Sequence, residues 1–497
     1  MKTNNRYIVT ILVVGLGFFS NAFAQEHRKD SLSHYIQVAI ENNPGVKSQS
    51  LVHEAFLEKI PQAGAFQDPE LSLEAYTMPM EIVGGRSIGN VSLMQMFPWF
   101  GTRKAARTEA THMANMQDQQ YREAVNNLIL QVSTQWYTMQ KLNEQLHNNE
   151  ENKKILDQLE QLALRKFSSP SSTARPTPVP TVSSNAPSAP SASTASSGMG
   201  GMSMGSGSTT TPAASSSMST SSGGSMGGMA GGSQSGMSEV LRIQLEIAEI
   251  ENNMASLYSQ IKAEKAKFNA LLNREATEEV VLGKEIYKVD FLYSEKEALT
   301  FIEQNNPMLE MISEEGLAFR AKAEMDRKMS YPMIGIGAQY MVVGKTDNMM
   351  LAMEGMNGKD MIMPMVSVSL PLFRKKYNAQ QKESELWRKS SEENFKNTFN
   401  ILKSEYYSFK SQLDDAERVV KLYDKQTTLA QTTYNLIVKE FITGKSDLTN
   451  VIQVQRQLLD YQLRKAEALA NYNTMVVSIK KLLAENNYEL SKNLSNE

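Results

Sequence analysis

The chain is duplicated internally, and no other feature limits its possible folds as strongly. The stretch from Glu41 to Pro69 recurs from Gln304 to Pro332 without an insertion or a deletion. Both copies carry the same Asn-Asn-Pro motif, at Asn42–Pro44 and at Asn305–Pro307. A repeat separated by about half the chain indicates a duplicated domain half and not a short solenoid repeat. We therefore expect the same elements in both halves, and we expect special function where the halves differ.

Each half is predicted to run in the same order: a helix, a pair of strands, one very long helix, a turn and a second helix. The strands alternate apolar and polar residues and end at Pro98 and Pro371, where a missing N–H is tolerated. The two long helical stretches contain neither proline nor glycine. About 65 helical residues extend nearly 100 Å, so each long helix needs partners along its length, as in coiled coils. The predicted elements are strands at about 70–97 and 333–370, long helices at about 102–167, 238–275, 375–441 and 446–485, and a helix from 31 to about 65 that is interrupted at Pro44.

The N-terminal segment 1–24 has the pattern of a secretory signal peptide. Basic residues precede the apolar stretch Ile8–Phe18, and Ala22–Ala24 forms a small-x-small cleavage site. The two structural repeats then cover 25–290 and 291–497. The chain has no cysteine, which excludes disulfides and the lipidated cysteine of a lipoprotein. Because no later segment approaches ~20 consecutive apolar residues, we expect an exported protein that crosses a membrane only with β-strands.

Charge and motifs exclude several classes of function. The formal net charge is −3 and both signs are interspersed, so nucleic acid is not an expected partner. No G-x-S-x-G, phosphate loop or HExxH motif occurs, and no catalytic triad can be assembled, so we expect no enzyme and no cofactor. The five histidines show no metal-ligand spacing and are expected at the surface.

Four short strands cannot form a lipid-exposed barrel by themselves, because their open edges would find no water to bond. Known membrane barrels need at least about eight strands. Either several chains share one barrel, or the strands form a small soluble sheet. The alternation leaves both open, while the signal peptide and the long helices favour the shared barrel.

Several motifs together resemble the TolC-like outer-membrane efflux channel family over nearly the whole mature chain. These are the duplicated Asn-Asn-Pro helices, the strand ends Phe97-Pro98-x-Phe100 and Leu370-Pro371-x-Phe373, and the turn Lys439–Leu448 followed by Val451 and Gln455. The copper- and silver-exporting type is the member that we expect.

The resemblance implies a mainly α fold with transmembrane β-strands: a homotrimer whose long coiled-coil hairpins form an α-helical tunnel joined to a shared 12-stranded β-barrel. It places the barrel in outer-membrane lipid of a Gram-negative bacterium and the helices in the periplasm. The hairpin tips would meet a periplasmic adaptor protein and an inner-membrane efflux pump. The loops at about 79–86 and 344–361 would face the outside.

The second hairpin tip matches the family's periplasmic entrance. Its residues are Phe441, Gly444, Ser446, Asp447, Asn450 and Gln453. Family members often carry acidic residues just after this turn, whereas Asn450 and Gln453 are amides, so a carboxylate gate is not expected and a polar helix face explains them. We expect Gly444 to close the incoming helix and Ser446 or Asp447 to cap the outgoing one.

The largest departure from symmetry is an insertion at 168–237, in the first hairpin tip, composed almost wholly of Ser, Gly, Ala, Pro, Thr and Met. Such a segment has too little apolar surface to fold, so we expect it to be disordered. Its thioethers suit Cu(I) or Ag(I); a low-complexity tether or an oxidant sink is the alternative. The candidate metal ligands are Met199, Met202, Met204, Met218, Met226, Met229 and Met237.

A second methionine group surrounds the second external loop. It comprises Met341, Met349, Met350, Met353, Met356, Met361, Met363 and Met365. By the strand alternation, Met94 and Met96 share a face with Ser367 and Ser369, which we expect to be the channel lumen.

The expected function is a passive outer-membrane exit duct of a tripartite efflux system that exports Cu(I) or Ag(I). The same channel exporting drugs or secreted peptides is an alternative. A periplasmic coiled-coil adaptor or scaffold is a second alternative, although an adaptor needs a β-rich domain between the helices of its hairpin.

Overall fold

The computed structural model describes residues 32–168, 235–283, 286–348, 350–351 and 355–485. The predicted signal peptide and nearly all of the predicted insertion lie outside these residues. The chain divides into two compact units, one formed by residues 1–155 with 247–497 and the other by residues 156–246.

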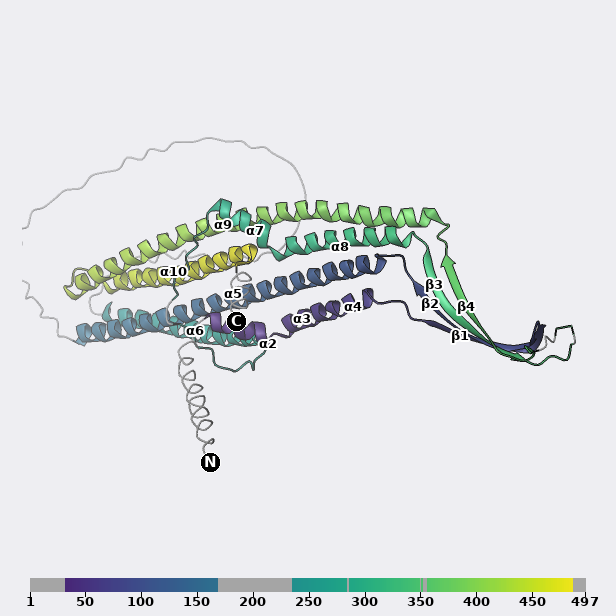
Figure 1. The fold of residues 1–497 in the computed structure, drawn as a ribbon. Helices are drawn as coiled ribbons and strands as arrows, with labels where there is room; N and C mark the ends of the chain where they lie inside the picture. Colours follow the sequence, from purple (N-terminus) through teal and green to yellow (C-terminus); the bar gives the residue numbers. More distant parts are fainter. Residues whose placement is uncertain (1–31, 169–234, 284–285, 349, 352–354, 486–497) are drawn as a thin grey trace, which may run out of the picture. The chain divides into compact units, whose positions relative to one another are not determined.

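Both halves contain the elements that the duplication predicts, in the same order (Figure 1). The first half has α2 (Leu32–Asn42), α3 (Pro44–Leu57), α4 (Lys59–Ala63), β1 (Glu70–Ile82), β2 (Gly85–Phe97), α5 (Thr102–Ser168) and α6 (Ser235–Leu271). The second half has α7 (Glu295–Asn305), α8 (Pro307–Met329), β3 (Met333–Gly344), β4 (Met361–Ser369), α9 (Arg374–Ile442) and α10 (Leu448–Leu483). The halves differ at Glu58, where the first half breaks its helix a second time while α8 continues to the strands.

The four strands form one antiparallel sheet in the order β1-β2-β3-β4 (Figure 1). Strand β2 pairs with β3, so the hairpins of the two halves join at the centre of the sheet. The register shifts between Ala75 and Met80, and β1 continues to Ile82, into the range 79–86 that was expected to be an external loop. Alternation did not reveal this extension, because an irregularity interrupts the period-two pattern.

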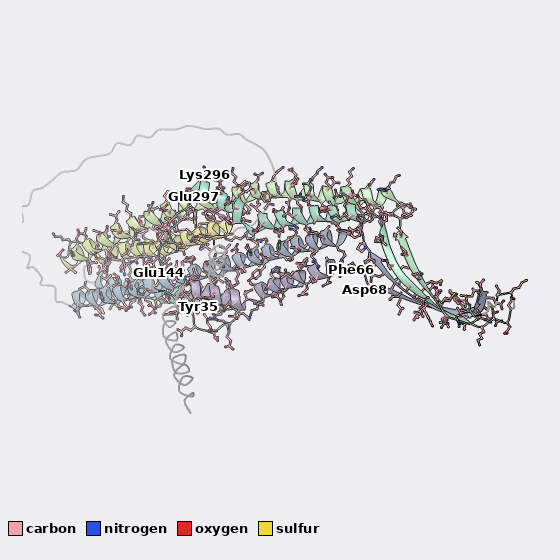
Figure 2. All side chains as sticks on the ribbon, viewed as in Figure 1. Tyr35, Phe66, Asp68, Glu144, Lys296 and Glu297 are labelled. Carbon is pink, nitrogen blue, oxygen red and sulfur yellow. The ribbon has the colours of Figure 1, made fainter. Side chains whose placement is uncertain are left out.

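The helices pack around two apolar cores, and the core around Tyr35 of the first half also includes Ala470 and Val477 of α10. Tyr35 of α2 is labelled in Figure 2. Its ring contacts those of Trp136 and Phe268, with centroid distances of 5.4 and 5.3 Å. In the second half, the core joins α7, α9 and α10 around Tyr406 and Ile479, which are fully buried. None of the described helices is both long enough and apolar enough to span a membrane.

The Asn-Asn-Pro motif has the same structural role in both halves. The side-chain oxygens of Asn43 and Asn306 accept backbone N–H groups from the first turn of the following helix, at 2.9 Å for Asn43 and 3.0 Å for Asn306. Their amide groups donate to the carbonyls of Leu271 and Leu482, both at 2.9 Å. These two leucines lie in the last turns of α6 and α10. The motif therefore fastens the start of one helix to the end of the returning helix.

Candidate functional sites at the hairpin turn and the strand face

The turn between α9 and α10 is closed by backbone hydrogen bonds. The N–H of Lys445 donates to the carbonyl of Glu440 at 2.9 Å, and the N–H of Gly444 donates to Phe441 at 3.0 Å. This pair of bonds is a Schellman motif, which needs a left-handed residue after the helix. Gly444 supplies it with φ +76°. The expected helix-closing role of Gly444 is confirmed.

The prediction that the side chain of Ser446 or Asp447 caps α10 is wrong. Asp447 occupies the N-cap position, with φ −89° and ψ 151°, but its carboxylate makes no capping hydrogen bond. The hydroxyl of Ser446 instead accepts from the side-chain amide of Asn450 at 3.5 Å. The backbone N–H of Asn450 bonds to the carbonyl of Asp447, so the first turn is stabilised through the main chain. The carboxylate of Asp447 is exposed at the turn.

The turn residues separate into a buried set and an exposed set. Phe441 is only 2% exposed and packs inside the hairpin. Asn450 and Gln453 are exposed on α10, where Gln457 and Asp460 continue the same face at helical spacing. The structure therefore places amides, and no carboxylate, at the two positions where the family often has acids.

Gln455, which follows the turn that resembles the efflux channel family, has a structural role on the opposite side of α10. Its side chain is buried, and its amide donates to the side-chain oxygen of Asn152 on α5 at 3.0 Å. This bond joins helices from the two halves of the chain, which gives a physical reason for glutamine at this position.

The helices of the first hairpin run antiparallel up to the insertion. Tyr258 donates to Glu150 at 2.9 Å in one unit, and Gln244 donates to Glu160 at 2.8 Å in the other. Met237, the last of the candidate ligands in the insertion, lies at the start of α6 and is 54% exposed. The other six, and Met349 and Met353 of the second group, lie outside the described residues.

One face of the sheet carries methionine and small polar residues. Residues that pair across antiparallel strands point to the same side, and the register places Met94 beside Gly337 and Gly337 beside Met365. The expectation that Met94 and Met96 share a face with Ser367 and Ser369 is confirmed. The face comprises Glu70, Ser72, Glu74, Asn90, Ser92, Met94, Met96, Met333, Gly335, Gly337, Gln339, Met341, Met361, Met363, Met365, Ser367 and Ser369.

The opposite face is apolar and exposed. Leucine, isoleucine, valine and tyrosine predominate on it, together with Gln95, and no methionine lies at its paired positions outside the register shift in β1. The seven methionines of the first face are half-buried, whereas most large apolar residues of this second face are exposed. These exposed residues are Leu71, Leu73, Leu93, Ile334, Ile336, Tyr340, Ile362, Val366 and Val368.

Two methionine sulfurs converge on one hydroxyl within the methionine face. The Oγ of Ser367 lies 3.5 Å from the sulfur of Met94 and 3.7 Å from the sulfur of Met96. In the register, Gly335 lies between Met96 and Ser367, and a Cβ at Gly335 would come within 2.6 Å of the Met96 sulfur. Strand alternation in the sequence indicated the shared face. It could not indicate that the two sulfurs meet at Ser367, because only the cross-strand register brings Gly335 and Ser367 together.

Aromatic and basic residues gather where the strands meet the helices. Phe66 lies between α4 and β1 (Figure 2) and contacts Phe97 edge-on, with centroids 5.6 Å apart. The guanidinium of Arg103 lies 3.3 Å over the Phe66 ring. A cavity of about 620 Å³ is lined here by Phe66, Phe97, Pro98, Trp99, Phe100, Arg103 and Ile336, among others. Aromatic residues at strand ends are typical of the boundary between lipid and water in membrane strands.

Comparisons with known proteins agree with this geometry. The family model described as outer membrane efflux protein matches residues 35–177. The outer membrane protein VceC of Vibrio cholerae has a TM-score of 0.61 at 11% identity, over 91% of this chain and 96% of that chain. The open-state MtrE outer membrane channel of Neisseria gonorrhoeae has 0.62 at 12% identity, over 91% and 88%. CusC, whose structures concern transmembrane channel formation, has 0.61 at 12% identity, over 91% of both chains.

No curated protein matches the sequence. At identities of 11–12% the likeness to the solved channels shows the fold alone. The family match is independent of that likeness, because it rests on the sequence of residues 35–177. Residues 35–177 are therefore similar in sequence to the outer membrane efflux protein family, and 91% of the chain shares the fold of solved outer-membrane channels.

Proposed function

We propose that this chain forms the passive exit duct of a tripartite efflux system, as a homotrimer in the outer membrane of a Gram-negative bacterium. The observation that carries this proposal is the two-faced sheet. Its exposed apolar face suits lipid, its polar and methionine face suits a lumen, and its edge strands β1 and β4 each have one unpaired edge among the described residues. Three copies would supply twelve strands and satisfy those edges in a closed barrel.

A stripe on α9 supports association between copies. Leu422, Leu429 and Leu436 recur every seven residues and are 43%, 57% and 56% exposed. Apolar residues at heptad spacing need a helical partner, and α10 already covers the buried side of α9. The neighbouring subunit of the trimer would supply that partner. The turn at Gly444 would then lie at the periplasmic end, where a periplasmic adaptor and an inner-membrane pump supply substrate and energy.

Cu(I) or Ag(I) is the proposed substrate. The support is chemical: thioethers bind soft monovalent ions without losing a proton, and seven methionines occupy the proposed lumen face. The methionines of the insertion would gather the same ions near the adaptor end. The duct would perform no chemistry and hold no resident cofactor.

Fractionation tests the duct itself. We expect the protein in the outer-membrane fraction as a trimer that resists SDS until it is heated. A soluble periplasmic monomer would contradict the duct and favour a coiled-coil adaptor or scaffold.

Deletion of residues 168–236 tests the role of the insertion. We expect the trimer to assemble, because the turn at Gly444 shows how few residues a hairpin tip needs. We also expect lower copper and silver tolerance with unchanged detergent and drug tolerance. Equal loss of all tolerances, or loss of none, would contradict a metal-specific insertion and favour export of drugs or peptides.

A further inference from the structure

We propose that Met94, Met96 and Ser367 form a binding site for a soft monovalent cation on the lumen face of the strands. The inference rests on the proposed function, because it gives the exported ion a defined place inside the duct. The site lies near the end of the sheet that joins the helices, where β2, β3 and β4 bring residues from both halves of the chain together.

The geometry converges on one point. Both sulfurs lie within 3.7 Å of the Ser367 hydroxyl, so two thioethers and one oxygen are close enough together to contact one ion. Gly335 lets both of these groups lie directly over the strand, since a Cβ at that position would be 2.2 Å from the Ser367 Oγ and 2.6 Å from the Met96 sulfur. Cu(I) and Ag(I) accept few ligands and prefer soft ones, which two sulfurs satisfy.

Core packing does not explain methionine here. Flexible thioethers usually fill gaps in a core, but the sheet is a single layer, and among the described residues no second layer packs on the methionine face. The opposite face meets its need for apolar surface with Leu, Ile and Val and uses no methionine at its paired positions. Apart from Met78 and Met80, at the register shift in β1, the methionines of the strands all lie on one face, which sulfur chemistry explains better than hydrophobicity.

The charges on this face suit a cation. Among its paired positions the only ionisable residues are Glu70 and Glu74, and neither lysine nor arginine occurs. A monovalent cation would therefore meet no like charge between the strands. Met365 pairs with Gly337 beside Met94, so another thioether lies one register position away and could receive the ion.

Silver binding to the intact, full-length trimer tests the site. The trimer is purified in chloride-free buffer with ¹³C-methyl methionine, titrated with Ag⁺, and the bound silver is counted by equilibrium dialysis. We expect Met94→Leu with Met96→Leu to lose one bound ion per chain. In the single Met94→Leu variant, the shift of the Met96 methyl resonance should need at least tenfold more silver. Gly335→Ala, which keeps every ligand but fills the space, should weaken the same shift.

The matched control removes two other sulfurs from the same hairpin. Met78 and Met80 of β1 are 88% and 72% exposed and lie within and at the end of the register shift, so Met78→Leu with Met80→Leu should leave the silver count unchanged. Equal losses in both double variants, or a Met96 shift that persists in Met94→Leu, would overturn the site.

Cell assays distinguish the proposed silver site from the proposal that the duct exports metal. Silver binding at the site with no dependence of metal tolerance on the protein would contradict metal export and leave the site standing. Metal tolerance that depends on the protein, but with no silver at Met94 and Met96, would overturn the site and leave metal export standing.

Discussion

At the scale of residues, Asn43 and Asn306 explain why both halves of the chain carry the Asn-Asn-Pro motif, because each makes two hydrogen bonds. Asn306 is 4% exposed and uses both ends of its amide, one as an N-cap acceptor and one as a donor to Leu482. Serine could replace the cap but could not reach the distant carbonyl, and aspartate has no donor. The residue type therefore follows from two simultaneous hydrogen bonds.

Substitution of Asn306 should separate these two bonds. Asn306→Ala is expected to lower the free energy of unfolding by about 2–3 kcal/mol, because it removes a cap and leaves a buried carbonyl unpaired. Asn306→Ser should recover about 1 kcal/mol of that loss. The control is Asn305→Ala, since Asn305 bonds only to Phe301 in its own helix. Urea titration in detergent measures the differences, and a serine variant as stable as the native protein would contradict the bridging role.

Alanine substitutions at two helix starts should change the stability of the protein by different amounts. Ser294 forms a full capping box with Glu297 at the start of α7, whereas Asp447 makes no capping bond at the start of α10. Ser294→Ala should therefore cost about 1 kcal/mol, while Asp447→Ala should change stability by less than about 0.5 kcal/mol. Thermal unfolding of both variants provides the comparison. A large loss in Asp447→Ala would mean that its carboxylate has a partner in another chain.

At the scale of elements, α9 depends on contacts spread along its length. One contact ties it to the segment that joins the two halves: Lys288 donates to Glu417 at 2.8 Å, and Lys421 contacts the same carboxylate at 3.1 Å. The hydrogen bond from Lys288, followed by that from Lys421, lowers the pKa of Glu417 to about 2. The pair is about one third exposed, so its energy is reduced by solvent.

This contact should make stability depend on acid. Because the folded pKa of Glu417 is below its ordinary value near 4.5, the contribution is complete above that value and is lost as the pH falls toward 2. We expect Glu417→Gln to lower the unfolding temperature slightly at pH 7, with the difference from the native protein shrinking between pH 4.5 and 2. A difference that stays constant with pH would show that the carboxylate charge is not responsible.

The elements were largely predictable from the sequence, and the exceptions have physical causes. Stretches without proline or glycine located α5 and α9 to within about one residue, because nothing in them interrupts a helix. The continuation of β1 to Ile82 was missed because a register shift breaks the alternation there. The cap at Asp447 was predicted from residue type, but the first turn of α10 is stabilised by a backbone bond that residue type does not encode.

At the scale of the whole molecule, the duplication builds one sheet from two hairpins. Alternation within a strand predicted which residues share a face, as it did for Met94 and Met96. It could not predict which strands become neighbours, so the meeting of Met96, Gly335 and Ser367 required the register of β2, β3 and β4. The resulting sheet has one apolar face and one face that carries methionine sulfurs.

The most direct test of metal export is the silver content of living cells. Cells that lack this protein are compared with cells that carry it after a brief exposure to Ag⁺, and cell-associated silver is measured by mass spectrometry. We expect several-fold more silver in the cells without the protein, and a return to the normal silver content when the native chain is restored. Equal silver in both, with a difference instead in a retained drug or dye, would contradict the proposed substrate.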